Sequence, residues 1–222
     1  MKSRPLVVAI DGPAASGKGT LAGRLADRFG FAHLDTGTLY RATALLVFEE
    51  AGDPADPVTA EAAARRVDAE LLSDPRLRSD EVAAAASVVA AIPAVRCALL
   101  ALQRDFTERP PAPARGVVLD GRDIGTVVCP AADVKLFITA STEARACRRV
   151  KELREQGGAA IYENVLQDLK QRDARDSERR AAPLAAAPDA IIIDTTALDA
   201  DMVLERVSDV VARMLKEKEW QQ

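Results

Sequence analysis

The stretch GPAASGKGT, residues 12–20, decides the fold of this 222-residue chain because of what lies on either side of it. The apolar run LVVAI of residues 6–10 comes before it and has the length and composition of a buried strand. In residues 18–29, which overlap its end, apolar side chains recur every four positions, as on one face of a helix that Gly30 would end. The stretch therefore predicts a tight loop between a strand and a helix.

Glycines and a lysine give this loop the spacing G-x-x-x-x-G-K, through Gly12, Gly17 and Lys18. A loop of this kind turns backbone N–H groups and the positive end of the next helix toward one point, and its lysine reaches the terminal phosphates of a nucleotide. A chance glycine turn is the weaker alternative, because the strand and the helix lie where the motif requires them. The predicted nucleotide-binding residues are Gly12, Pro13, Ala14, Ala15, Ser16, Gly17, Lys18, Gly19 and Thr20.

Five short apolar runs have the character of buried parallel strands, at residues 6–10, 32–34, 116–119, 134–139 and 190–193. Helical patterns lie between them, which predicts an α/β fold: a doubly wound sheet of about five parallel strands with helices on both faces. Ligands of such folds bind beyond the carboxyl ends of the strands. Asp11, Asp35, Asp120 and Asp194 occupy those ends, with a turn or capping role as the alternative for each.

Residues 54–113 depart from this alternation of strand and helix. Their alanine-rich part, residues 81–91, favours helix, and only residues 67–73 have the character of a strand. Pro110, Pro111 and Pro113 stiffen the return to the strand expected at residue 116. We therefore expect one domain over residues 1–222, with a helical insert at 54–113.

Composition narrows the class of partner. The formal net charge is −4 and the sequence pI about 5.2, which favours a small molecule over a nucleic acid polymer, whose binding usually needs a basic face. The sequence has no apolar stretch long enough to predict a membrane span. Cys97, Cys129 and Cys147 have neither paired nor metal-ligand spacing, so we expect reduced core cysteines and a cytoplasmic protein.

One detail of the loop departs from the general motif. Gly19 stands directly after the loop lysine, where most P-loop proteins have serine or threonine, and the hydroxyl comes one residue later in Thr20. The sequence GKGT is typical of nucleoside monophosphate kinases. Two further stretches, LDTGTLYR at 34–41 and DGRDIGTVV at 120–128, resemble signatures of the bacterial cytidylate kinase family. The resemblance extends through Ser87 and Arg96, RDARD at 172–176 and APL at 182–184. It implies a P-loop kinase that phosphorylates CMP and dCMP with ATP.

The resemblance also implies roles for individual residues. Thr36 and Arg41 would hold the monophosphate of the acceptor, and the family commonly has serine where Thr36 stands. Arg122 and Asp123 would lie near the base and sugar, where a carboxylate favours cytosine over uracil. The acceptor set is Thr36, Arg41, Ser87, Arg96, Arg122, Asp123, Arg172, Asp176 and Arg179, and the catalytic set is Lys18, Arg122, Arg172, Asp176 and Arg179.

For several of these residues a purely structural role is the alternative. By spacing, Arg172, Asp176 and Arg179 share one helix face, where a solvated ladder of ion pairs is the alternative. Arg41 could equally be an exposed helix residue and Ser87 an ordinary one. His33 is expected to have no catalytic role, because the acceptor is already a phosphate anion.

A cluster of basic residues precedes Gln156-Gly157-Gly158, namely Arg145, Arg148, Arg149, Lys151 and Arg154. It predicts a hinged lid over residues 148–162 that closes on the triphosphate of ATP and excludes water, with Arg148 and Arg149 as donor contacts. A solvated helix followed by a loop is the alternative. For Mg²⁺ the expected ligands are Thr20 and Asp120, directly or through water.

Other functions leave recognisable marks on a sequence. A kinase for another nucleoside monophosphate should alter the stretches at 120–128 and 87–96, and a GTP-driven switch would need the guanine-reading motif N-K-x-D, which this sequence lacks. The resemblance also implies that the helical insert at 54–113 binds the acceptor nucleotide. The segment between Arg41 and Ser87 is short for the small antiparallel sheet that family members often carry there, which leaves the tightness of base and sugar selection open. The family resemblance implies a monomer.

Overall fold

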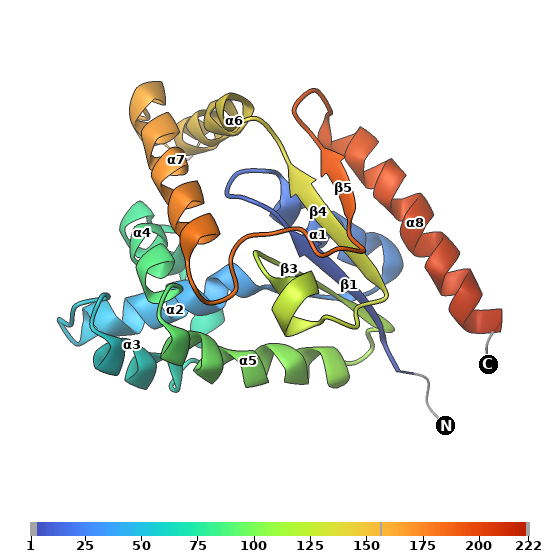
Figure 1. The fold of residues 1–222 in the computed structure, drawn as a ribbon, viewed down its shortest axis with the longest axis horizontal. Coiled ribbons are helices and arrows are strands. Elements are labelled where there is room, and N and C mark those ends of the chain that lie inside the picture. Colours follow the sequence, from blue (N-terminus) through green and yellow to red (C-terminus); the bar gives the residue numbers. More distant parts are fainter. Residues whose placement is uncertain (1–3, 156, 221–222) are drawn as a thin grey trace.

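A five-stranded parallel sheet forms the centre of the computed structural model, which describes residues 4–155 and 157–220, without the side chains of 218–220. The strands lie in the order β2-β3-β1-β4-β5 (Figure 1). They are β1 (Leu6–Asp11), β2 (Ala32–Asp35), β3 (Gly116–Gly121), β4 (Val134–Thr139) and β5 (Ile191–Asp194). All five apolar runs are thus strands, and the predicted α/β fold is confirmed.

Helices cover both faces of the sheet (Figure 1). Because side chains alternate along a strand, Leu6, Val8 and Ile10 pack with α1 and α8, whereas Val7 and Ala9 pack on the other face with α2, α4 and α5. The helices are α1 (Lys18–Phe29), α2 (Thr36–Glu49), α3 (Pro57–Ala64), α4 (Asp80–Val89), α5 (Pro93–Glu108), α6 (Thr142–Glu155), α7 (Tyr162–Glu178) and α8 (Ala200–Trp220).

The segment 54–113 is helical, as predicted, and shares its core with α2 and the sheet. The expectation of a strand-like stretch at 67–73 is wrong: it is irregular chain that ends in a short 3₁₀ helix, Leu71–Ser73. Val67 and Leu71 are four positions apart, a helical rather than an alternating spacing, and both pack against the core that α2 forms.

Two expectations about burial are wrong. Strand β5 lies at the edge of the sheet, where Ile191 and Ile192 are 40% and 61% exposed and Ile193 is buried. Cys97 and Cys147 are exposed on helices α5 and α6 rather than in the core, and Cys129 is partly buried. Both errors have one cause: an apolar residue type does not reveal which elements a particular chain leaves uncovered.

Helices α6 and α7 form a separate layer above the carboxyl ends of the strands (Figure 1). Ala146 and Val150 of α6 pack with Val165 and Leu169 of α7, and Ala14 joins this small core from the loop after β1. The expected hinge residue Gln156 lies outside the described residues. Within them, no single helix is long and apolar enough to cross a membrane; α4 and α5 pass that test only as a pair bent by 102°.

Candidate active site

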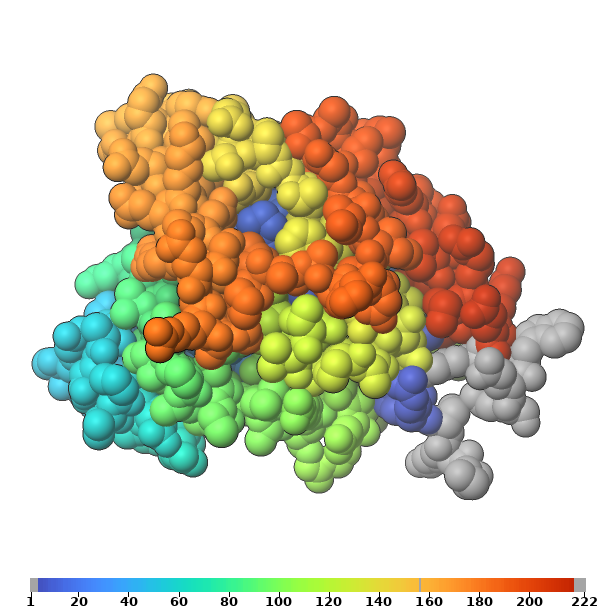
Figure 2. All heavy atoms as spheres, viewed as in Figure 1, coloured from blue at the N-terminus to red at the C-terminus, as the bar shows by residue number. Residues whose placement is uncertain are grey.

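One large cavity opens at the carboxyl ends of the strands, with a volume of about 1060 Å³. In Figure 2 atoms of the amino-terminal part, in blue, lie at the bottom of a hollow beside the yellow and orange helices α6 and α7. Every predicted site residue except Gly12 and Pro13 lines this cavity: Ala14, Ala15, Ser16, Gly17, Lys18, Gly19, Thr20, Thr36, Arg41, Ser87, Arg96, Asp120, Arg122, Asp123, Arg148, Arg149, Arg172, Asp176 and Arg179.

The loop between β1 and α1 has a backbone that requires two of its glycines. Gly17, directly before α1, has φ of 87°, a conformation that side chains disfavour. A Cβ added to Gly12 would lie 2.1 Å from the carbonyl oxygen of Ile138, so the loop can pass the end of β4 only without a side chain. These glycines give the loop its compact curve and leave the first N–H groups of α1 pointing into the cavity.

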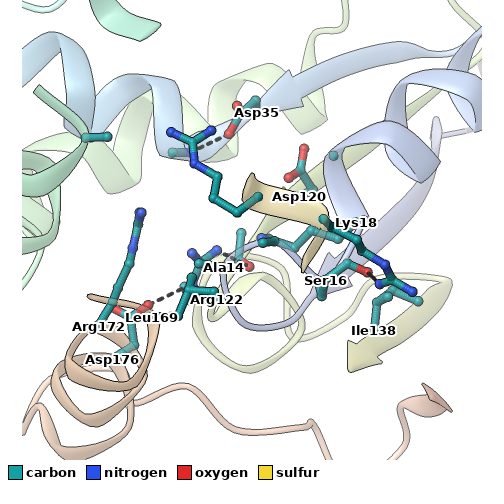
Figure 3. A pocket seen from close by; sticks show the side chains of 18 of the residues that line it. Ala14, Ser16, Lys18, Asp35, Asp120, Arg122, Ile138, Leu169, Arg172 and Asp176 are labelled. Carbon is teal, nitrogen blue, oxygen red and sulfur yellow. Dashed lines mark hydrogen bonds and ion pairs between the residues drawn. The ribbon is translucent and has the colours of Figure 1, made fainter. Parts of the chain in front are cut away.

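Lys18 and Ser16 lie within this loop as buried polar residues (Figure 3). Lys18 Nζ donates to the carbonyl oxygen of Pro13 at 3.1 Å. Burial lowers the pKa of Lys18 to about 7, with the positive charge of Arg122 acting in the same direction and Asp120 opposing it. The Ser16 hydroxyl makes no hydrogen bond to any described residue. A bound anion would give the Lys18 ammonium a negatively charged partner and the Ser16 hydroxyl a hydrogen-bond acceptor.

Asp11, at the end of β1, connects the loop to a second functional segment. Its carboxylate accepts hydrogen bonds from the backbone N–H groups of Ile124 at 2.7 Å and Gly125 at 2.8 Å. Burial raises the pKa of Asp11 to about 6, although both hydrogen bonds oppose the shift. Asp11 thereby fixes the turn that follows β3 and carries Arg122 and Asp123.

The other strand-end aspartates divide into two kinds. Asp35 accepts from the Gly37 N–H at 2.9 Å as the cap of α2, and Asp194 accepts from the Thr196 N–H at 2.8 Å, so both have the turn or capping role. Asp120 is buried in the cavity wall and contacts His33 Nε2 at 2.8 Å through Oδ1. Burial opposes protonation of His33, but the hydrogen bond to Asp120 and its charge raise the His33 pKa above the ordinary value.

Arginines gather where β3 faces α7 (Figure 3). Arg122 Nε donates to Asp176 Oδ2 at 2.8 Å, and Asp176 is only 5% exposed, so a solvated ladder is ruled out for this aspartate. Burial and then the charge of Arg122 lower the pKa of Arg172 to about 10. Arg172 Nε makes no hydrogen bond to the described residues, and among them Arg41 has no ion-pair partner. This excess of partly buried positive charge favours an anionic ligand.

Arg179 differs from the prediction that placed it on one helix face with Arg172 and Asp176. Helix α7 ends at Glu178, and Arg179 has extended backbone angles, φ −61° and ψ 137°. Its side chain still lines the cavity, with Nε donating to the Ala182 carbonyl at 2.6 Å and Nη2 lying 3.7 Å from Asp123 Oδ1. A spacing of seven residues predicts a shared face only while the helix continues.

Asp123 is the centre of a compact polar pocket on the insert side of the cavity. Its Oδ2 forms an ion pair with Arg96, whose guanidinium lies 5.5 Å above the ring centre of Tyr40. The nearby hydroxyl of Ser87 is buried without a hydrogen-bond partner among the described residues. Asp123 and Arg96 are thus in direct contact, and Ser87 lines the same cavity.

The basic residues of α6 have different surroundings, and not all of them face the cavity. Arg145 is buried behind the loop in an ion pair with Asp173 and does not face the cavity. Arg148 Nη1 donates to Thr195 Oγ1 at 3.0 Å, and Arg149 pairs with Asp80 of α4 at 2.6 Å. Lys151 also lines the cavity and lies 3.9 Å from Glu155, and Arg154 donates to the Ala160 carbonyl at 3.1 Å.

Sequence reasoning missed four connections in this site: Asp11 with the turn after β3, His33 with Asp120, Arg145 with Asp173, and Tyr40 with Arg96. The position of Asp11 at a strand end was a usable signal. The residue types and spacing around His33, Arg145 and Tyr40 gave no such signal, because the partner of each residue lies on another element.

Comparisons with known proteins agree with this geometry. The model of the family "Cytidylate kinase" matches residues 8–213. A cytidylate kinase of Rhodospirillum rubrum is 55% identical over 207 residues, covering 93% of this chain and 97% of its own, and one of Paramagnetospirillum magneticum is 55% identical over 205 residues, covering 92% and 97%. A solved structure of an uncharacterized protein from Eubacterium ventriosum shares the fold, with a TM-score of 0.55, 14% identity and coverage of 95% and 99%. By the family match and the identity along nearly its whole length, this chain belongs to the cytidylate kinase family.

Proposed function

We propose that this chain transfers the terminal phosphoryl group of ATP to CMP and dCMP, giving ADP with CDP or dCDP. One observation carries the proposal: a single cavity contains both the phosphate-binding loop with Lys18 and the excess of arginines that Arg41, Arg122 and Arg172 supply. A nucleotide switch needs the first feature only. A kinase that acts on a second phosphate needs both.

The loop side of the cavity takes the donor. Backbone N–H groups at the start of α1 and the Lys18 ammonium would hold the β- and γ-phosphates of ATP. Lys18 now donates to a carbonyl within its own loop, so phosphate oxygens would replace that weaker acceptor. Arg148 and Arg149 line the cavity from α6 and are the proposed donor contacts of a lid over residues 148–162.

The opposite side takes the acceptor. Thr36 and Arg41, at the start of α2, lie where they can bind its phosphate, although the Thr36 hydroxyl here donates to the Asp120 carbonyl at 2.8 Å. Ser87, Arg96 and Asp123 form the polar pocket that would receive the base. We propose that cytosine is preferred because its exocyclic amine donates a hydrogen bond to an acceptor in this pocket, whereas uracil presents an oxygen there.

The reaction joins these two sides in line. A phosphate oxygen of CMP attacks the γ-phosphorus, the bond from that phosphorus to the bridging oxygen of the β-phosphate breaks, and ADP leaves. No general base is needed, because the attacking oxygen is already anionic. Arg122, Arg172 and Arg179 neutralise charge around the migrating group, and Asp176 holds Arg122 in place at 2.8 Å. Asp176 remains ionised because Arg122 and Arg172 lower its pKa against the effect of burial.

The residues present fit a magnesium ion that arrives with ATP. A Cβ on Gly19 would lie 3.7 Å from Asp120 Oδ2, so this carboxylate faces the start of α1, where Thr20 offers a hydroxyl. Within the described residues, no group of three or more potential metal ligands exists. Mg²⁺ commonly takes one or two protein oxygens and completes its shell with phosphates and water. Bound there, the ion would neutralise the charge of the donor phosphates.

A monomer is sufficient for this function, because the described residues of one chain supply both sides of the cavity. The proposal includes a cytoplasmic location, where free nucleotides and reduced thiols occur. A kinase for another nucleoside monophosphate is the competing function, and it would use the same loop with a different reading of the base.

Phosphorus NMR of the purified chain with ATP, Mg²⁺ and CMP tests the proposal directly. We expect CDP and ADP to appear in equal amounts, with little inorganic phosphate. Arg28→Lys serves as a control, because Arg28 bonds Glu205 and Ser208 of α8 outside the cavity. Inorganic phosphate without CDP would reduce the activity to ATP hydrolysis, and no turnover of ATP would refute the proposal.

A further inference from the structure

Arg145 is a buried arginine for which the reaction described above has no direct use. It lies on α6, only 3% exposed, and each of its guanidinium nitrogens is hydrogen-bonded. Nε donates to the Ala140 carbonyl at 3.1 Å, and Nη2 donates to Thr142 Oγ1 at 2.9 Å. With the bonds of this guanidinium to Ala14 and Asp173 included, all of its N–H donors are used, so this arginine cannot also bind a phosphate.

The remaining bonds of Arg145 connect the two sides of the cavity. Nη1 donates to the carbonyl of Ala14 in the phosphate-binding loop at 3.1 Å and to Asp173 Oδ1 at 3.1 Å, while Nη2 donates to Asp173 Oδ2 at 2.6 Å. Asp173 is the neighbour of Arg172 on α7 and lies three residues before Asp176. One guanidinium therefore bridges the donor loop and the helix that carries acceptor-side residues.

Apolar packing continues the same connection. Ala14 packs in a small core with Val150 of α6 and Leu169 of α7. Packing of this kind tolerates small shifts, but the planar fork of arginine on a carboxylate fixes both direction and distance. The loop is thus held to α7 by a rigid contact rather than by apolar burial alone.

We propose that Arg145 and Asp173 form a positioning pair, which sets the spacing between the phosphate-binding loop and α7 and so aligns the donor phosphates with the acceptor arginines. This inference rests on the proposed function for its kinetic consequence. Neither residue contacts a substrate. Loss of the pair leaves the two half-sites intact but misplaced, and an ångström of misplacement costs roughly 100-fold in rate in positioned reactions.

Asp173→Asn is the main test, because it keeps the shape of the side chain and Asp173 is partly exposed. The amide presents an NH₂ donor to one guanidinium nitrogen, so one of the two parallel bonds becomes a donor–donor contact. We expect turnover with CMP to fall about 10- to 100-fold. We also expect the dissociation constants of ADP and CMP, measured separately by calorimetry, to stay within about threefold of the parent values.

The ratio of inorganic phosphate to CDP distinguishes positioning from a role in stability alone. Misalignment should raise this ratio, because water can replace a misplaced acceptor, whereas partial unfolding lowers both products together. Arg145→Lys, which keeps the charge without the fork, should show the same rise, and Arg28→Lys, the same change in a pair between α1 and α8, should show none. An unchanged ratio in Asp173→Asn overturns the inference.

Amide hydrogen exchange decides the inference independently of any kinase activity. Asp173→Asn should speed exchange in peptides that cover residues 12–17 and 165–178 and leave the sheet unchanged. If the parent chain makes no CDP, the proposed function fails, but faster exchange in both segments would still support the pair. Unchanged exchange in both segments overturns it.

Discussion

At the scale of single residues, the cavity holds charges that the folded chain alone does not satisfy. Lys18 is buried, with a pKa lowered to about 7, and Arg172 is partly buried, with a pKa lowered to about 10. Such groups cost stability, and nucleotide phosphates would recover it. The distribution of buried charge is therefore itself an argument for anionic ligands on both sides of the cavity.

Lys18→Met should remove turnover and at the same time stabilise the ligand-free chain. Loss of the Lys18 ammonium, which would stabilise charge in the transition state, should lower turnover about 100-fold or more. Because the folded pKa lies below the unfolded one, burial of the protonated lysine costs most below about pH 7, and the cost declines as pH rises toward 10.5. Thermal unfolding at pH 6 and pH 10 checks the sign. A variant less stable than the parent at pH 6 would contradict it.

Asp123→Asn should lower the preference for CMP over UMP about tenfold in kcat/KM, because one hydrogen-bond acceptor of the base pocket becomes a donor. Steady-state kinetics with both acceptors measure the ratio. Asp105→Asn is the matched control, since Asp105 pairs with Arg109 on the surface of α5. An unchanged ratio in Asp123→Asn would place base reading elsewhere in the cavity.

At the scale of elements, the chain predicts its strands well and their surroundings less well. The strand after residue 5 and the helix after Gly17 follow from periodicity and from the turn that the glycines allow, and the structure confirms both. Periodicity did not predict the exposure of β5 or the end of α7 before Arg179, because both depend on which neighbours cover an element. Local pattern fixes an element's type more firmly than its limits or its burial.

Helices α4 and α6 meet across the mouth of the cavity through the ion pair of Asp80 with Arg149, at 2.6 Å. Asp80 and a triphosphate would compete for the same guanidinium. Asp80→Asn should therefore lower KM for ATP about two- to threefold, the scale of a partly exposed ion pair. Glu61→Gln, in a pair with Arg65 on α3, is the control. An unchanged or higher KM for ATP would show that Arg149 does not contact the donor.

At the scale of the whole molecule, the fold places segments from across the chain around one cavity. The motifs at 12–20, 34–41 and 120–128 all follow strands, so their convergence could be predicted from the rule that parallel strands end at one edge. The contacts that hold these motifs in position could not be predicted in this way. Asp11 reaches Ile124 across 113 residues and His33 reaches Asp120 across 87, and only tertiary packing determines such pairs.

The most direct test of the account is the initial rate of ADP release from ATP and Mg²⁺ with CMP, dCMP, UMP, AMP, GMP and dTMP offered separately at equal concentration. The account predicts that CMP and dCMP are the best acceptors. A higher rate with any other monophosphate would keep the kinase chemistry of the loop and arginines but contradict the assignment of Ser87, Arg96 and Asp123 to cytosine. No release above the rate without acceptor would contradict the phosphotransferase itself.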